Sequence, residues 1–389
     1  MKKALAITVL LQTIVFAESF DNFLKKAIEH SPYLKSYALG VEQAKDQGDI
    51  ITRYANPSLA LEYSEFDPNM GDKDNGYRVN YKQPIRLWGV GDDKEGLSKA
   101  TVQSANALYV QKKAVFIRDI SLVYTLYSQQ KMLMDLGVEE LEIAKKIYEI
   151  SQARYEAGTI SRGVMLQSQV AYEMIRIRNE NLSLETMQSY YDLLEQAGIS
   201  EEIELDTQYE FTLYGPADSS QNPDVLSLYS EQEKALSQAA VNSNAIEWMN
   251  LYAEFENEPD QDITRVGVNF PLAFFNTKSQ EKQIARLEAD KADLLIQNQN
   301  TQLALEGNKL RKQRQKLIRL KEQNNKVLAT EIELLKMFEE GYKISNINLL
   351  ELQDIKNKVI ETKERLIQIT TALNQNAITT NYMRGSYNE

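Results

Sequence analysis

Residues 76–84 read GYRVNYKQP. An extended backbone points successive side chains to opposite faces, so this stretch has one apolar row and one polar row. The apolar row is Tyr77, Val79 and Tyr81, and the polar row is Arg78, Asn80 and Lys82. Almost all of the chain that follows has a helical period instead. A strand with two such different faces therefore needs a partner strand and a reason for its apolar row.

The second half of the chain contains a counterpart of this stretch. Residues 78–85, RVNYKQPI, align with residues 265–272, RVGVNFPL, at an offset of 187. YEAG at 155–158 aligns with FEEG at 338–341 at an offset of 183. Matches in one order at nearly constant offsets indicate a tandem duplication. We assign the first repeat to residues 18–205 and the second to 206–389, each with a short helix, two strands, a long helix, a glycine turn and another helix.

Two hairpins with long acidic tips are predicted, one in each repeat. The strands are expected at about 57–66 and 76–84, and at about 247–256 and 262–271. Each has about the 9 to 11 residues that a tilted transmembrane β-strand needs. The only two tryptophans, Trp88 and Trp248, fall at the same end of their hairpins, as an aromatic girdle at a membrane surface would. The alternative is two surface hairpins, each packing one face on helices.

Long helices are predicted after each hairpin. They are expected at about 92–157, 162–197, 278–340 and 346–377. Uninterrupted helices of about 65 residues would be about 100 Å long at ~1.5 Å per residue. Heptad spacing runs through them, from Ile120 by sevens to Tyr155 and again at Leu320, Val327 and Leu334. This pattern indicates coiled-coil packing, and the wide polar faces are typical of helices that line a solvated space.

The N-terminus has the pattern of a secretory signal peptide over residues 1–17. Lys2 and Lys3 precede an uncharged apolar run at 4–16, and Ala17 ends a small-residue cleavage pattern. The run of thirteen residues is short for a membrane anchor, which needs about 20. Cleavage would lower the net charge from −12 to −14. An acidic exported chain is a poor nucleic-acid binder.

No enzyme motif is present. The chain has no cysteine, and its single histidine, His30, sits at a predicted helix end before Ser31-Pro32. There is no glycine-rich phosphate loop, no GxSxG and no HExxH. We therefore expect no catalytic residue, no cofactor and no metal site.

Taken together, the sequence resembles the TolC family of outer-membrane efflux proteins, most closely its heavy-metal CzcC-type branch. The resemblance is carried by the duplication, the Asn56-Pro57 and Gln83-Pro84 strand boundaries, RYEAGTIS at 154–161 and FEEGYKISNINLLELQ at 338–353. It implies a mainly α fold with a small transmembrane β part. Each chain of a homotrimer would add four strands to one twelve-stranded β-barrel and its long helices to an α-barrel.

The resemblance also implies a function and partners. The protein would be the passive exit duct of a tripartite efflux pump, in the outer membrane of a Gram-negative bacterium. It would dock onto a periplasmic adaptor and an inner-membrane pump of the RND type, which supplies the energy. Two alternatives stay open: a duct for type I protein secretion, and a soluble periplasmic coiled-coil scaffold.

Site residues follow from the same resemblance. The tips that would meet the adaptor contain Tyr155, Gly158 and Ser161 in the first repeat and Phe338, Gly341 and Ser345 in the second. Both glycines are expected to permit a left-handed turn. Glu351 and Asp354 match an acidic pair that would ring the pore entrance, and Tyr342 matches a gate tyrosine. The arginine that partners this tyrosine in relatives has no counterpart, because Asn346 and Ile347 occupy that region.

Overall fold

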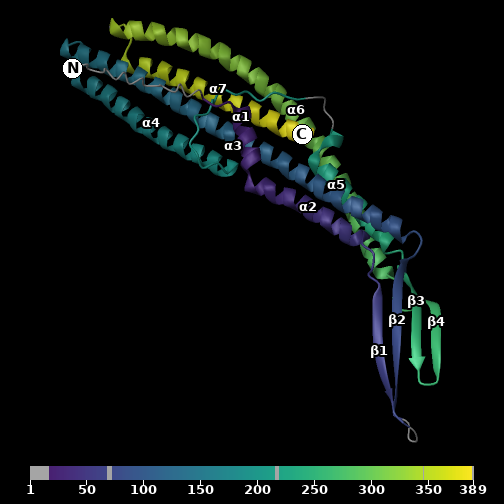
Figure 1. Cartoon of the computed structure of the whole chain (residues 1–389). Helices are drawn as coiled ribbons and strands as arrows, with labels where there is room; N and C mark the ends of the chain where they lie inside the picture. Colours follow the sequence, from purple (N-terminus) through teal and green to yellow (C-terminus); the bar gives the residue numbers. More distant parts are fainter. Residues whose placement is uncertain (1–16, 68–71, 215–218, 345, 388–389) are drawn as a thin grey trace, which may run out of the picture. The chain divides into compact units, whose positions relative to one another are not determined.

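The computed structural model describes residues 17–67, 72–214, 219–344 and 346–387 (Figure 1). The signal peptide expected at 1–17 therefore lies almost wholly outside the described residues, and Ser345 lies outside them too. The helices are α1 Phe20–His30, α2 Pro32–Thr52, α3 Val90–Glu156, α4 Arg162–Ala197, α5 Pro223–Val241, α6 Ser279–Lys343 and α7 Leu349–Met383, with a short 3-10 turn at Ser219–Gln221. The strands are β1 Ser58–Phe66, β2 Asp74–Arg86, β3 Trp248–Glu258 and β4 Gln261–Asn269.

The mainly helical fold with a small β part is confirmed. In each half a helix, two strands, a helix of 67 or 65 residues and a helix of 36 or 35 residues follow one another. This order is what the duplication requires, and the duplication itself stays a prediction. None of the helices among the described residues carries an apolar stretch long enough to span a membrane.

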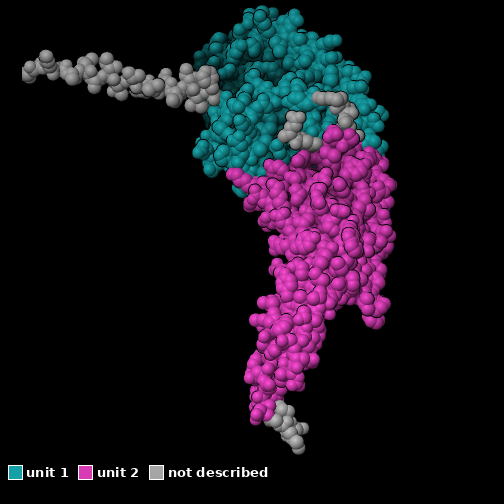
Figure 2. All heavy atoms as spheres, turned by 45° about the vertical axis from the view of Figure 1, so that its right-hand side comes forward, with its two compact units in different colours: residues 1–34, 113–218, 304–389 teal, residues 35–112, 219–303 magenta. Residues whose placement is uncertain are grey.

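The chain forms two compact units, coloured separately in Figure 2. Unit 1 comprises residues 1–34, 113–218 and 304–389, and unit 2 comprises residues 35–112 and 219–303. Each unit takes segments from both halves of the chain. The compact units therefore cut across the sequence repeats, and α3 and α6 contribute residues to both units.

In unit 2 the four strands form one antiparallel sheet in the order β1-β2-β3-β4 (Figure 1). The central pairing of β2 with β3 joins the two halves of the chain. Tyr77 lies opposite Tyr63, and Val79 lies opposite both Leu61 and Phe255. Because directly paired residues share a face, the apolar row of β2 belongs to an apolar face that spans the whole sheet.

Nothing among the described residues covers this apolar face. Its large side chains are exposed, with Val266 at 72%. The exposed members are Leu59, Leu61, Tyr63, Tyr77, Tyr81, Leu251, Phe255, Val266 and Val268. The alternative in which each hairpin packs one face on helices is therefore wrong for the described chain.

The opposite face of the sheet carries a network of charges across all four strands. Arg78 of β2 binds Glu62 of β1 at 3.0 Å and also binds Glu256 of β3. Arg265 of β4 binds Glu254 and Glu256 of β3, each at 2.5 Å. The sheet is thus apolar on one side and ionic on the other, with no side that resembles a protein core.

Two buried clusters hold unit 1 together. The first joins α1, α3 and α4 to the segment after α4, with the Phe20 and Tyr124 rings 4.5 Å apart. The second lies among α3, α6 and α7 and consists of Ile147, Leu335, Tyr342, Leu349, Leu352, Ile355 and Val359. The heptad side chains differ in solvent exposure. Ile120 and Tyr127 of α3 are buried, whereas Val327 of α6 is exposed.

Candidate gate, helix tips and membrane girdle

The predicted gate residue Tyr342 lies in the last turn of α6 and is only 1% exposed. Its hydroxyl is 2.8 Å from Oγ of Ser151 on α3, and that serine hydroxyl donates to the Ile147 carbonyl. Since the single serine proton is used in that way, the tyrosine is the donor to Ser151. Within one chain, Tyr342 is therefore part of the packing between α3 and α6.

An arginine does contact Tyr342, although not from the region where the sequence interpretation looked for one. Arg154 of α3 donates to the Tyr342 carbonyl at 2.9 Å, and its guanidinium carbon lies 4.6 Å from the ring centroid. The two residues are 188 positions apart in the sequence. Arg154 belongs to the RYEAGTIS segment, and only the fold reveals its cation–π contact with the tyrosine.

The acidic pair lies at the start of α7, and both side chains are exposed. Glu351 forms a capping box with Asn348, in which each side chain accepts from the other residue's backbone N–H, at 3.1 and 2.9 Å. Asp354 binds Lys358, one turn further along, at 2.7 Å. The hydrogen bond to Asp354 raises the pKa of Lys358, which stays cationic beside the pair. The i,i+4 spacing of Asp354 and Lys358 was readable from the sequence and was missed.

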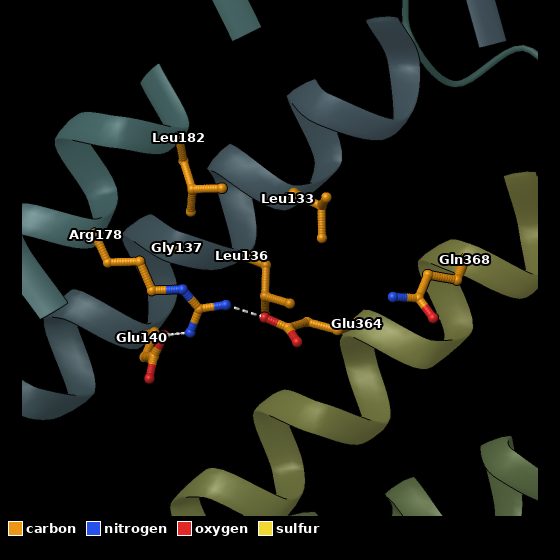
Figure 3. Close-up of a pocket in the computed structure, with 8 residues that line it drawn as sticks. All are labelled: Leu133, Leu136, Gly137, Glu140, Arg178, Leu182, Glu364 and Gln368. Atoms are coloured by element: carbon orange, nitrogen blue, oxygen red, sulfur yellow. Dashed lines mark hydrogen bonds and ion pairs between the residues drawn. The ribbon is translucent and has the colours of Figure 1, made fainter. Parts of the chain in front are cut away.

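An ionic cluster with a buried centre joins α3, α4 and α7. Glu140 accepts from Lys356 at 2.8 Å and from Arg178 at 3.0 Å, and the side chains of Glu140 and Lys356 are each 6% exposed. Figure 3 shows Arg178 of α4 reaching between Glu140 of α3 and Glu364 of α7, at the edge of a cavity of about 180 Å³. Sequence reasoning did not identify these residues. Lys356 on the otherwise apolar face of α7, next to Ile355, was the available signal.

The first tip matches its prediction in backbone geometry. Gly158 has φ +71°, Thr159 N–H donates to the Arg154 carbonyl at 2.9 Å, and Gly158 N–H donates to the Tyr155 carbonyl at 2.9 Å. This pattern is a Schellman motif with glycine at the left-handed position. Ser161 then caps α4 by accepting from Val164 N–H at 3.4 Å.

The second tip differs, and the expectation of a left-handed turn at Gly341 is wrong. Gly341 is a helical residue of α6, which continues to Lys343, and it does not have positive φ. Glycine is needed there for another reason, because a Cβ would lie 2.5 Å from Cγ1 of Ile347. Phe338 packs against the Tyr342 cluster rather than projecting from the tip.

The two tryptophans lie at the same end of the sheet but in different surroundings. Trp88 follows β2 and is 90% exposed. Trp248 begins β3 opposite Arg86, whose guanidinium carbon lies 4.8 Å from the indole and 4.4 Å from the Tyr54 ring. Trp248 is therefore half-buried against a cation and a second aromatic ring.

Among the described residues, no group of three or more His, Cys, Asp or Glu side chains is arranged to hold a metal ion.

Comparison with solved structures gives a consistent result. The transmembrane channel CusC matches with a TM-score of 0.77 and 15% identity over 94% of this chain and 91% of its own. The outer-membrane channel OprN matches with a TM-score of 0.76 and 13% identity over 95% and 90% of the two chains. The outer-membrane protein VceC of Vibrio cholerae matches with a TM-score of 0.73 and 13% identity over 94% and 95%. The chain has the fold of these channels.

No family model matches the sequence, and no curated protein matches it either. At these identities the likeness concerns the fold alone. The channel fold brings Tyr342 together with Ser151 and Arg154, and it sets Glu351 and Asp354 beside each other at the start of α7. The two tryptophans belong to unit 2, whereas the tip and gate residues belong to unit 1.

The first tip of this channel fold offers a test with two neighbouring glycines. Gly158→Ala should lower the free energy of unfolding by about 1–2 kcal/mol, because a side chain in the left-handed region is strained. Gly163→Ala, at the second residue of α4, should be neutral or stabilising by up to about 1 kcal/mol, because alanine fits this helical backbone and restricts the unfolded chain. Urea unfolding followed by circular dichroism measures both. Equal effects at the two positions would contradict the turn assignment.

Proposed function

We propose that this protein is the outer-membrane exit duct of a tripartite efflux pump. The observation that carries the proposal is the four-stranded sheet with an uncovered apolar face and an ionic face. A sheet in water buries its apolar face in a core, whereas a transmembrane barrel turns that face to lipid and its polar face to the lumen. The row of Tyr77, Val79 and Tyr81 would then contact lipid, and Arg78, Asn80 and Lys82 would face water.

A homotrimer would complete this structure. Strands β1 and β4 are the two edges of the sheet, and unpaired edges are not tolerated in lipid. In the trimer, β4 of one copy would pair with β1 of the next copy, so that no sheet edge stays unpaired.

The helices of unit 1 also carry two unpartnered heptad seams. One consists of Val170, Ile177, Leu184 and Tyr191 on α4, and the other consists of Leu320, Val327 and Leu334 on α6, all exposed. In the trimer, the seam on α6 would likewise pack on the seam on α4 of the next copy.

The gate and the tips belong to the same proposal. The contacts of Tyr342 with Ser151 and Arg154 would hold the end of α6 against α3 in a closed state. The exposed Tyr155 and Ile344 near the two tips would meet a periplasmic adaptor, and an inner-membrane pump of the RND type would supply the energy. The duct itself would then need no catalytic residue. The heavy-metal CzcC-type assignment rests on the sequence segments alone.

Purified protein tests the function directly. We expect the mature chain to leave the membrane fraction only with detergent, and to form ion-conducting channels when reconstituted into a planar bilayer. Tyr342→Phe combined with Arg154→Gln should raise the conductance, because both contacts between α3 and α6 are lost. Release of the protein by carbonate washing alone, with no channel activity on reconstitution, would refute the proposal.

The acidic pair at the start of α7 is proposed to line the pore entrance. Three copies would bring six carboxylates together, which favours cations through the field of like charges. Lys358 at 2.7 Å from Asp354 reduces that field, so Glu351 should contribute more than Asp354.

We therefore expect Glu351→Gln to lower the cation preference and divalent-cation block of single channels more than Asp354→Asn does. Lys358→Gln should change the preference in the opposite direction, because it unmasks Asp354. Reversal potentials in a salt gradient measure all three variants. Unchanged potentials in every variant would remove these residues from the pore.

A further inference from the structure

The segment between β4 and α6, residues 270–278, reads FPLAFFNTK and is unusually apolar for a connection. The alternation of apolar residues in β4 continues in the sequence past Asn269, the last strand residue, as far as a backbone bend at residues 274–275. The row is Val266, Val268, Phe270, Leu272 and Phe274, all exposed, and Phe275 is fully exposed beside it. Exposed apolar clusters of this kind mark interaction surfaces.

The segment is held in place at both of its ends. Asn269 pairs with Asn250 of β3 at its start. At its end, Lys278 has φ 55° and its Nζ lies 2.5 Å from Glu247, which also binds Lys94 at 2.6 Å. The two phenylalanines therefore lie between two anchored points, Asn269 at the end of β4 and Lys278 before α6.

The two ends of the sheet carry different side chains. The end near residues 270–278 contains Trp88, which is 90% exposed, and its Lys94 and Lys278 are both paired with Glu247. The hairpin ends at the other side are rich in carboxylates, with Glu65, Asp67, Asp74, Glu258, Asp260 and Asp262. Aromatic side chains are favoured at the headgroup level of a membrane, whereas clustered carboxylates favour water.

We propose that Phe274 and Phe275 insert into the boundary between headgroups and acyl chains of the phospholipid leaflet on the helical side, and that they form the girdle together with Trp88. This inference rests on the proposed function, because it extends the lipid-facing side of the sheet beyond the last residue of β4. It also changes the girdle that the sequence predicted, because Phe274 and Phe275 take the place of Trp248 while Trp88 is kept. Trp248 serves to hold Arg86 against Tyr54, and the phenylalanines that follow β4 take the position in the membrane.

Depth-dependent fluorescence quenching tests the inference. The chain has no native cysteine, so Phe275→Cys can carry a single environment-sensitive dye in the full-length protein. The labelled protein is reconstituted into vesicles of phosphatidylethanolamine and phosphatidylglycerol that contain spin-labelled lipids. We expect nitroxides near the headgroups to remove most of the fluorescence, nitroxides at the chain ends to remove less, and aqueous iodide to have little effect.

Two controls separate the inference from the proposed function. Val266→Cys reports on the sheet face, and Asp260→Cys at the β3–β4 turn should be quenched by iodide alone. Quenching of Val266→Cys by lipid together with free iodide access to Phe275→Cys would overturn the inference and leave the duct intact. So would shielding of position 275 from both quenchers, which would mean that protein covers it. Absence of lipid quenching at position 266 would count against the duct itself.

Discussion

Replacing Glu140 with alanine is expected to lower the free energy of unfolding by about 3–5 kcal/mol, because it leaves the buried Lys356 ammonium without its counter-ion. Arg178 also loses one of its two carboxylate partners. The substitution should weaken the contact between α3 and α7, because the Glu140–Lys356 ion pair joins these two helices. Thermal and urea unfolding of the detergent-solubilised protein, followed by circular dichroism, measure the effect.

A matched pair on the same helix gives the control. Lys131 and Asp135 form an exposed i,i+4 ion pair at 3.2 Å, so Asp135→Ala should cost no more than about 1 kcal/mol. The double variant Glu140→Leu with Lys356→Met should recover most of the loss, because a buried pair is replaced by apolar groups. If Glu140→Ala cost no more than Asp135→Ala, the cluster would be no more than a solvated surface feature.

The second large effect concerns two adjacent residues of β1. Leu61→Arg puts a charge on the apolar face and should cost about 2–4 kcal/mol at the middle of a bilayer. Ala60→Arg puts the same charge on the ionic face, next to Asn80, and should be tolerated. The fraction of protein recovered in the outer membrane should fall sharply for the first variant only. Equal recovery of both variants would contradict the assignment of the faces.

The strand pattern could be predicted because it depends on local geometry. Alternation in GYRVNYKQP requires only an extended backbone, and the register of β1, β2 and β3 places Tyr77, Val79 and Tyr81 on one face. Helix ends were less accurate: α7 ends at Met383 rather than near residue 377. No proline or glycine stops the helix there, so the sequence offers no end signal before Gly385.

The gate contacts could not be predicted, because they join residues far apart in the chain. The approach of Arg154 to Tyr342 and of Lys356 to Glu140 depends on how three helices pack. The role of Gly341 could not be predicted from the sequence for a different reason. A glycine near a helix end predicts a left-handed cap, whereas here the close approach of Ile347 requires it inside the helix. Both uses look identical in sequence.

Two neighbouring residues of β2 distinguish the lipid-facing side of the sheet from its water-facing side. Val79→Cys and Asn80→Cys each introduce the only cysteine of the chain. Val79 lies on the exposed apolar face and Asn80 donates to Glu254 on the ionic face at 2.7 Å. In cells, we predict that a membrane-partitioned thiol reagent labels position 79 and a small charged reagent labels position 80. Labelling of position 79 by the charged reagent, with position 80 protected, would contradict the proposal that this sheet turns its apolar face to lipid.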